Sequence, residues 1–171
     1  GSLRAAWQWA GFLLITAGGY GELIEVISVA FMVAYALGPV SFTVLRATHP
    51  DIPRPFRLPG GTAMAPIAFV LASLLLYWSK WPRTGETLGI LLIGALIYGG
   101  YAVAGRVPWR SVRYGSWLIT YLIVMAALSY LGDTAFGGIG VLPLGWDMLA
   151  ISVFSLAIYR WAVRQGIAYS A

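Results

Sequence analysis

Apolar residues are arranged in six long stretches, and the segments between them hold most of the charged residues and prolines. A helix needs about 20 predominantly apolar residues to cross a bilayer, within a range of roughly 17–25. The pattern predicts six such helices, of which the first is the weakest because its uninterrupted apolar core is short. Strands are disfavoured because the apolar residues do not alternate with polar ones. The expected spans are Leu3–Gly19, Glu22–Leu45, Thr62–Ser79, Glu86–Gly105, Ser116–Gly132 and Leu144–Val163.

Composition supports a bilayer as the natural solvent of this chain. Hydrophobic residues make up 60% of the 171 positions and charged residues only 10%. Soluble domains carry about 25% charged residues, so a chain of this size could not hide so much apolar surface from water. We therefore expect an all-α integral membrane protein with about six transmembrane helices.

The basic residues predict how these helices cross the membrane. Cytoplasmic loops retain an excess of Lys and Arg. With the N-terminus inside, the outer side holds only Lys80 and Arg83. Both termini are therefore expected in the cytoplasm, with the chain integral to the cell membrane. The cytoplasmic side then holds nine arginines, namely Arg4, Arg46, Arg54, Arg57, Arg106, Arg110, Arg113, Arg160 and Arg164.

The segment "HPDIPRPFRLPGG" at residues 49–61 separates the second and third expected spans. Proline lacks an N–H and disfavours helix in the residue before it, so the four prolines predict an extended loop. Arg46, Arg54 and Arg57 resist translocation and can meet anionic headgroups of membrane lipids, which makes them a cytoplasmic loop anchor. A regulatory or gating contact is the alternative interpretation of this loop.

Several classes of function are disfavoured by the residues present. The chain has no cysteine and a single histidine, so it offers no disulfide, no thiolate metal site and no histidine cluster. The net charge of +5 is explained by membrane topology and does not require a nucleic-acid partner. The "FGGIG" sequence at residues 136–140 lacks the Lys-Ser/Thr of a phosphate loop. We expect no enzymatic activity, no metal and no cofactor.

Residues 28–61 resemble the tenth transmembrane helix and following loop of amino-acid–polyamine–organocation (APC) permeases. In that family a helix with a "Y-x-x-G-P" step is followed by "R…P-x-x-P-R-P-F-R-x-P-G". Tyr35, Gly38 and Pro39 match the step. The loop is matched by Arg46, Pro50, Pro53, Arg54, Pro55, Phe56, Arg57, Pro59 and Gly60.

The resemblance implies that the chain is the C-terminal part of a LeuT-like inverted-repeat transporter. The six spans would be helices nine to fourteen, as in the fourteen-helix branch that includes aspartate–proton symporters. In this family the amino-acid substrate binds chiefly between broken first and sixth helices, which would lie upstream of Gly1. The fragment would depend on the rest of the permease and would not transport alone. A non-transporting membrane scaffold or accessory subunit is the alternative.

Glu25 is the first candidate for a functional role. It lies near the expected outer end of the second span and shares a helix face with Glu22. An acid at membrane depth often carries a proton or gates a pathway. The simpler interpretation is a solvated residue in the first turns of a helix, where the dipole favours negative charge.

Tyr35, Gly38 and Pro39 form a second candidate, near the middle of the same span. The Tyr35 hydroxyl needs a partner at that depth. The Gly38-Pro39 step frees a backbone carbonyl and predicts a kink, serving either packing or gating. The resemblance places this helix along the outer part of the substrate pathway.

Small residues recur every fourth position in the fourth expected span, as at Gly85 and Gly89 or Ala95 and Gly99. Such steps let helix backbones approach closely in lipid. We expect them to serve packing within the chain, with a homodimer interface as the alternative. Asp147 lies near the start of the last span, where we expect its negative charge to interact favourably with the positive end of the helix dipole.

Overall fold

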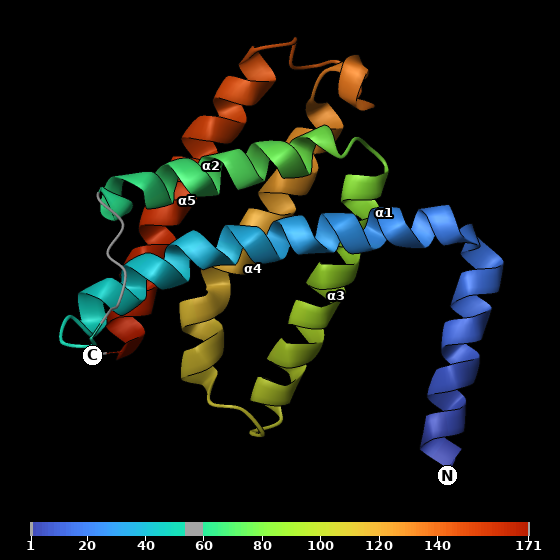
Figure 1. Cartoon of the computed structure of the whole chain (residues 1–171), viewed down its shortest axis with the longest axis horizontal. Coiled ribbons are helices and arrows are strands. Elements are labelled where there is room, and N and C mark those ends of the chain that lie inside the picture. Colours follow the sequence, from blue (N-terminus) through green and yellow to red (C-terminus); the bar gives the residue numbers. More distant parts are fainter. Residues whose placement is uncertain (1, 54–59, 171) are drawn as a thin grey trace.

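The computed structural model describes residues 2–53 and 60–170, and within α1 it describes side chains only at positions 21, 24 and 25 and from 27 onward. The described chain is helical and contains no strand, which confirms the all-α fold class (Figure 1). The elements are α1 (Ser2–Thr48), α2 (Gly61–Trp78), α3 (Arg83–Val103), α4 (Trp109–Leu131), the short 3₁₀ helix η1 (Thr134–Phe136) and α5 (Trp146–Ser170).

In the described part, five helices are long and apolar enough to cross a membrane, with Ile27–Thr48 as the apolar part of α1. Two of them extend beyond the expected spans. α4 begins at Trp109 and not at Ser116, while α5 continues to Ser170 and not only to Val163. The extensions contain arginines, which are good helix formers. Hydropathy therefore marks the part of a helix that suits lipid and not the full length of the helix.

The two helices expected at residues 3–19 and 22–45 form one continuous element, α1. The glycines at positions 18, 19 and 21 do not interrupt it, because glycine weakens a helix without removing a backbone N–H. Figure 1 shows that the N-terminal part of α1 turns away from the remainder. The side chains of 3–19 lie outside those described, so the first span and the six-span topology stay predictions.

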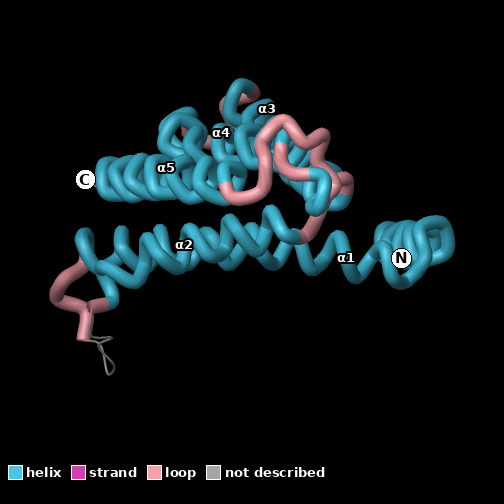
Figure 2. Tube along the Cα trace, turned by 90° about the horizontal axis from the view of Figure 1, so that it is seen from above, coloured by secondary structure: helices cyan, strands magenta, loops and turns pink. Residues whose placement is uncertain are grey.

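The helices form two layers (Figure 2). One layer contains α1 and α2, and the other contains α3, α4 and α5. The core lies between them, where Phe69 of α2 is fully buried. Its ring lies 5.5 Å from that of Tyr121 and 5.7 Å from that of Tyr159, between centroids. The Tyr159 and Thr43 hydroxyls are 2.7 Å apart, so the polar ends of these buried rings have partners.

Backbone hydrogen bonds end α3 at its C-terminus and direct the chain into α4. The Arg106 N–H bonds the Tyr101 carbonyl at 2.9 Å and the Ala104 N–H bonds the Gly100 carbonyl at 2.9 Å. Gly105 between them has a φ of 71°. This is the left-handed turn that ends many helices, and glycine adopts it without steric cost. The chain then reverses into α4, so that α3 and α4 lie side by side.

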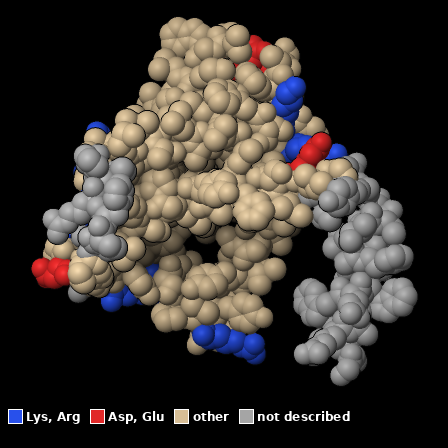
Figure 3. Space-filling model, in the orientation of Figure 1, with Lys and Arg blue, Asp and Glu red and all other residues tan. Residues whose placement is uncertain are grey.

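Charged side chains gather at opposite ends of the helices (Figure 3). Arg46, Arg106 and Arg110 belong to the ends where α1 and α3 finish and α4 begins. Of the acids, only Asp51 lies in the chain at that end, while Asp133 and Asp147 lie where α4 finishes and α5 begins. We call these the basic end and the acidic end.

Candidate functional site on α1

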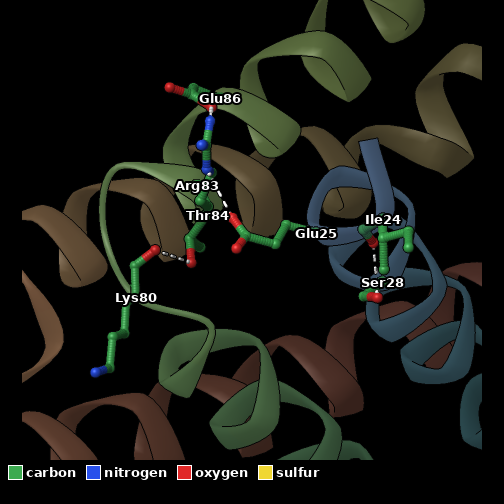
Figure 4. Close-up of polar contacts among 7 residues, drawn as sticks. All are labelled: Ile24, Glu25, Ser28, Lys80, Arg83, Thr84 and Glu86. Atoms are coloured by element: carbon green, nitrogen blue, oxygen red, sulfur yellow. Dashed lines mark hydrogen bonds and ion pairs between the residues drawn. The ribbon is translucent and has the colours of Figure 1, made fainter. Parts of the chain in front are cut away.

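Glu25 lies in an ion-pair cluster with the first turn of α3 (Figure 4). Arg83 Nε donates to Glu25 Oε2 at 2.9 Å, and Arg83 Nη1 donates to Glu86 Oε2 at 3.1 Å. The side chain of Glu25 is 60% exposed and that of Arg83 is 30% exposed. One guanidinium thus joins an acid on α1 to an acid on its own helix.

Local structure explains why Arg83 is placed there. It is the first residue of α3, directly after the tight turn from α2. The next residue, Thr84, is fully buried, and its hydroxyl donates to the carbonyls of Leu76 at 3.2 Å and Lys80 at 3.1 Å. Because these bonds fix the first turn of α3 against the end of α2, the neighbouring Arg83 is presented to α1.

The pair can hold the acidic ends of α1 and α3 together, but only weakly. Exposed ion pairs contribute about 0.2–1 kcal/mol, since water screens them and two long side chains lose freedom. Glu25 is therefore neither buried nor isolated. The sequence predicted Glu25 in the first turns of a helix, whereas α1 begins at Ser2 and continues through Glu25. It also did not identify Arg83 as the partner of Glu25.

Tyr35 lies on an exposed face of α1. Its side chain is 69% exposed, and its ring stacks on that of Phe31 with centroids 6.5 Å apart. The opposite face is buried against the other helices through Val33, Ala36 and Val40. The exposed face contains residues at helical spacing, namely Ile24, Ile27, Phe31, Tyr35, Gly38 and Leu45.

Gly38 and Pro39 share this helix without ending it. α1 continues through Pro39 to Thr48. A Cβ at Gly38 would meet no atom within 4 Å, so the described chain leaves open space beside it. Whether the step serves as a hinge stays a prediction. The structure does bring Tyr35 and Gly38 to one open face, and it places Glu25 near the acidic end.

Arg46, one of the three expected loop anchors, lies in the last turn of α1. Its guanidinium carbon is 4.3 Å from the centroid of the Phe42 ring. A Cβ at Gly61 would come within 3.4 Å of its Nη1 atom, so Arg46 also lies against the start of α2. Arg54 and Arg57 lie outside the described residues. The anchoring role of all three stays a prediction.

A second polar cluster joins α2, α4 and α5 at the acidic end. The Tyr77 hydroxyl donates to Asp147 Oδ2 and accepts from the backbone N–H of Asp133 at 3.1 Å. Asp147 Oδ1 accepts from the N–H groups of Gly145 at 2.9 Å and Met148 at 2.6 Å. Asp147 is fully buried, so these donors replace the water that a carboxylate would otherwise need.

The loop between α4 and α5 closes over this cluster. Asp133 Oδ1 accepts from the Ala135 N–H at 2.8 Å, and Asp133 Oδ2 accepts from the Leu144 N–H at 3.0 Å. The Trp81 N–H donates to the Phe136 carbonyl at 2.9 Å, which fastens the loop to the turn between α2 and α3. The sequence predicted the acid in the first turn of α5 but missed Tyr77. The only signal was that a tyrosine in an apolar run needs a partner.

The amino-acid sequence is similar to parts of known bacterial transporters. The chain is 44% identical to the glutamate/serine transporter AimA of Bacillus subtilis over 152 residues, covering 86% of this chain and 28% of the transporter. It is 34% identical to the aspartate-proton symporter of Bacillus subtilis over 181 residues, covering all of this chain and 34% of the symporter.

A third relative is the branched-chain amino acid permease BcaP of Bacillus subtilis, 32% identical over 81 residues, or 47% of this chain and 17% of the permease. The chain thus spans about a third or less of the length of the relatives it matches. No family model and no solved structure match it. These relatives are amino-acid transporters, in agreement with the resemblance of residues 28–61 to amino-acid permeases, and this chain is similar to a part of each.

Proposed function

We propose that the chain forms the C-terminal helices of a proton-coupled amino-acid transporter, in which α1 lines the outer part of the substrate pathway. The observation that carries this proposal is the similarity, over the whole chain, to an aspartate-proton symporter. An acidic or small polar amino acid is the proposed substrate class, because two of these relatives are named for glutamate, serine and aspartate.

The packing of α1 supports this role. A helix in lipid gains nothing from exposing a tyrosine hydroxyl to acyl chains, since the hydroxyl finds no polar partner there. Tyr35 and Gly38 lie together on the exposed face. In the proposal this face meets the rest of the permease, and the Glu25–Arg83 pair holds the acidic end of α1 beside α3. α2–α5 act as the scaffold behind it.

A chimera tests the proposal directly. The corresponding segment of AimA would be replaced by this chain and the hybrid reconstituted in vesicles. We expect glutamate or serine uptake above that of empty vesicles, whereas the 171-residue chain alone should accumulate no amino acid. Intact AimA is the positive control. A chimera that inserts and remains monodisperse but shows no uptake would contradict the proposal, as would proton-driven uptake by the 171 residues alone.

We also propose that the basic end and both termini face the cytoplasm. The segregation of charged residues supports this orientation. Thr134 in the α4–α5 loop and Ser170 at the end of α5 are both exposed, so each is suited to single-cysteine labelling. An impermeant thiol reagent should label Thr134→Cys in intact cells and Ser170→Cys only after lysis. The reverse pattern would overturn the orientation.

A further inference from the structure

An apolar cavity of about 370 Å³ lies between α1, α3 and α4. Figure 3 shows a hollow in the molecule beneath α1. The volume of the cavity falls within the range of roughly 300–1,000 Å³ that is typical of ligand pockets. The lining is almost entirely aliphatic and includes Val33, Leu37, Leu91, Ala95, Leu118 and Ile119. No charged residue lines it, so an amino acid with its ammonium and carboxylate groups would be poorly bound there.

On α3 and α4 the cavity lies along the part nearer the basic end, whereas on α1 it is lined by residues from Ala30 to Leu37, in the part of the helix nearer Glu25. The cavity wall on α4 runs from Ser111 to Leu122, about 16 Å at a rise of roughly 1.5 Å per residue. One turn further toward the acidic end the helices close, since Leu88 is 1% exposed and Met125 is fully buried. Half of a hydrocarbon core of about 30 Å is about 15 Å. Along α4 the cavity therefore has about the length of the acyl region of one leaflet.

A cation held over two aromatic rings lies in the region that adjoins the cavity. A neighbouring pocket shares Tyr98, Ser111 and Gly115 with the cavity and is also lined by Tyr114 and Tyr169. The guanidinium carbon of Arg110 lies 5.5 Å from the Tyr114 ring centroid and 5.4 Å from that of Tyr169. A positive charge therefore lies over two rings of the pocket that adjoins the cavity.

Backbone contacts hold this guanidinium in place. Arg110 Nη2 donates to the carbonyls of Ala168 at 3.4 Å and Tyr169 at 3.2 Å, near the end of α5. A guanidinium carries five N–H groups, so it can also donate to a phosphate. Among the described residues, no acid lines the cavity or the neighbouring pocket.

We propose that this cavity binds one acyl chain of an anionic phospholipid, with the lipid phosphate at Arg110. The apolar lining and its length along α4 fit the acyl chain, and the nearby Arg110 charge fits the phosphate. A transmembrane helix is a poorer occupant, because it is about 10–12 Å wide with its side chains and continues through both leaflets. The proposal concerns a site on α1, α3 and α4 and does not depend on transport.

Native mass spectrometry of the purified 171-residue chain in detergent provides the test. The probes are phosphatidylglycerol and phosphatidylcholine with identical acyl chains. We expect one phosphatidylglycerol to be retained per chain, in preference to phosphatidylcholine. Arg110→Gln should lower phosphatidylglycerol retention by about tenfold, a ratio within reach of one charge-assisted hydrogen bond. Arg113→Gln removes the same charge from an exposed position on the same helix and should have little effect.

Gly115→Leu tests the acyl-chain half of the proposal. A Cβ at Gly115 meets no atom within 4 Å, so the leucine can fill the cavity without displacing protein atoms. We expect it to abolish lipid retention. Gly94→Leu is the matched control, because Gly94 is equally open but lies on an exposed part of α3 outside the cavity. Ala34→Leu fills the same space from α1 if Gly115→Leu fails to fold.

Two results would overturn the proposal. One is equal retention of both lipids with no response to Arg110→Gln, and the other is retention unchanged by Gly115→Leu and Ala34→Leu. A photo-crosslinking residue at Leu118, in membranes, gives an independent outcome. Mass addition of a phospholipid would support the site, whereas a crosslink to polypeptide alone would make the cavity a protein interface.

Discussion

Two acids on this chain, Asp147 and Glu25, lie at the same end of the helices in opposite environments. Asp147 is fully buried and accepts hydrogen bonds from one hydroxyl and two backbone N–H groups. Glu25 is 60% exposed and has an arginine partner that is itself shared with Glu86. The first belongs to a network within the described helices, whereas the second stands at the border of an open face.

The different environments of Asp147 and Glu25 distinguish a packed region of the chain from an exposed one. Around Asp147, groups from the surrounding helices and loop donate hydrogen bonds to the carboxylate. An unpaired carboxylate in an apolar region would raise the free energy of the folded state strongly. Along α1, Phe31, Tyr35 and Gly38 remain uncovered by the described residues. We infer that the helices and loop around Asp147 form the rigid scaffold. The exposed face of α1 would contact another part of the protein, which in the proposed function is the rest of the permease.

Removing the Asp147 carboxylate should give the largest loss of stability. Asp147→Ala leaves the Tyr77 hydroxyl and two N–H groups without their acceptor. Each such loss costs about 1–3 kcal/mol, and partial rehydration at the helix end limits the sum to roughly 2–4 kcal/mol. Denaturant unfolding in detergent, followed by circular dichroism, measures the change. Glu86→Ala, which removes an exposed acid, should stay within about 1 kcal/mol; equal losses in both variants would contradict the scaffold assignment.

The loop over Asp147 should be the next most sensitive element. Gly137 has a φ of 78°, and a Cβ there would come within 2.4 Å of the Trp81 carbonyl oxygen. Gly137→Ala therefore adds a backbone clash to the roughly 1–2 kcal/mol of left-handed strain.

Gly145 is the matched control for that substitution. It also has a positive φ, 97°, but a Cβ would meet nothing within 4 Å. Gly145→Ala should therefore cost the strain alone. The same unfolding measurement separates the two variants, and a Gly145→Ala loss as large as that of Gly137→Ala would show that the loop is not held against Trp81.

The helical fold was predictable from sequence because long apolar stretches in a chain without strand-like alternation leave few alternatives. The acid near the start of α5 was predictable from its position. Tertiary partners were not, since the residues of each pair lie far apart in sequence and no local pattern connects Tyr77 with Asp147 or Glu25 with Arg83. The separate first span stays a prediction, because the side chains of residues 3–19 lie outside those described.

Glu25 should give the smallest stability change and the most informative functional one. Glu25→Gln keeps the side-chain size and should alter the free energy of unfolding by less than about 1 kcal/mol, as for an exposed ion pair. In the full transporter we expect it to change the pH dependence of uptake, because glutamine cannot titrate. Arg83→Gln removes the other half of the pair, and Glu86→Gln is the control that leaves the contact with α1 intact.

A double-mutant cycle decides whether Glu25 and Arg83 act as a unit. If the pair holds α1 beside α3 during transport, the uptake rate of Glu25→Gln/Arg83→Gln should equal that of either single variant, since removing one partner already breaks the contact. Glu86→Gln should leave uptake near its original rate. Additive effects, with Glu86→Gln as damaging as Glu25→Gln, would mean that the ion pair does not couple the helices. Glu25 would then be a solvated residue on α1.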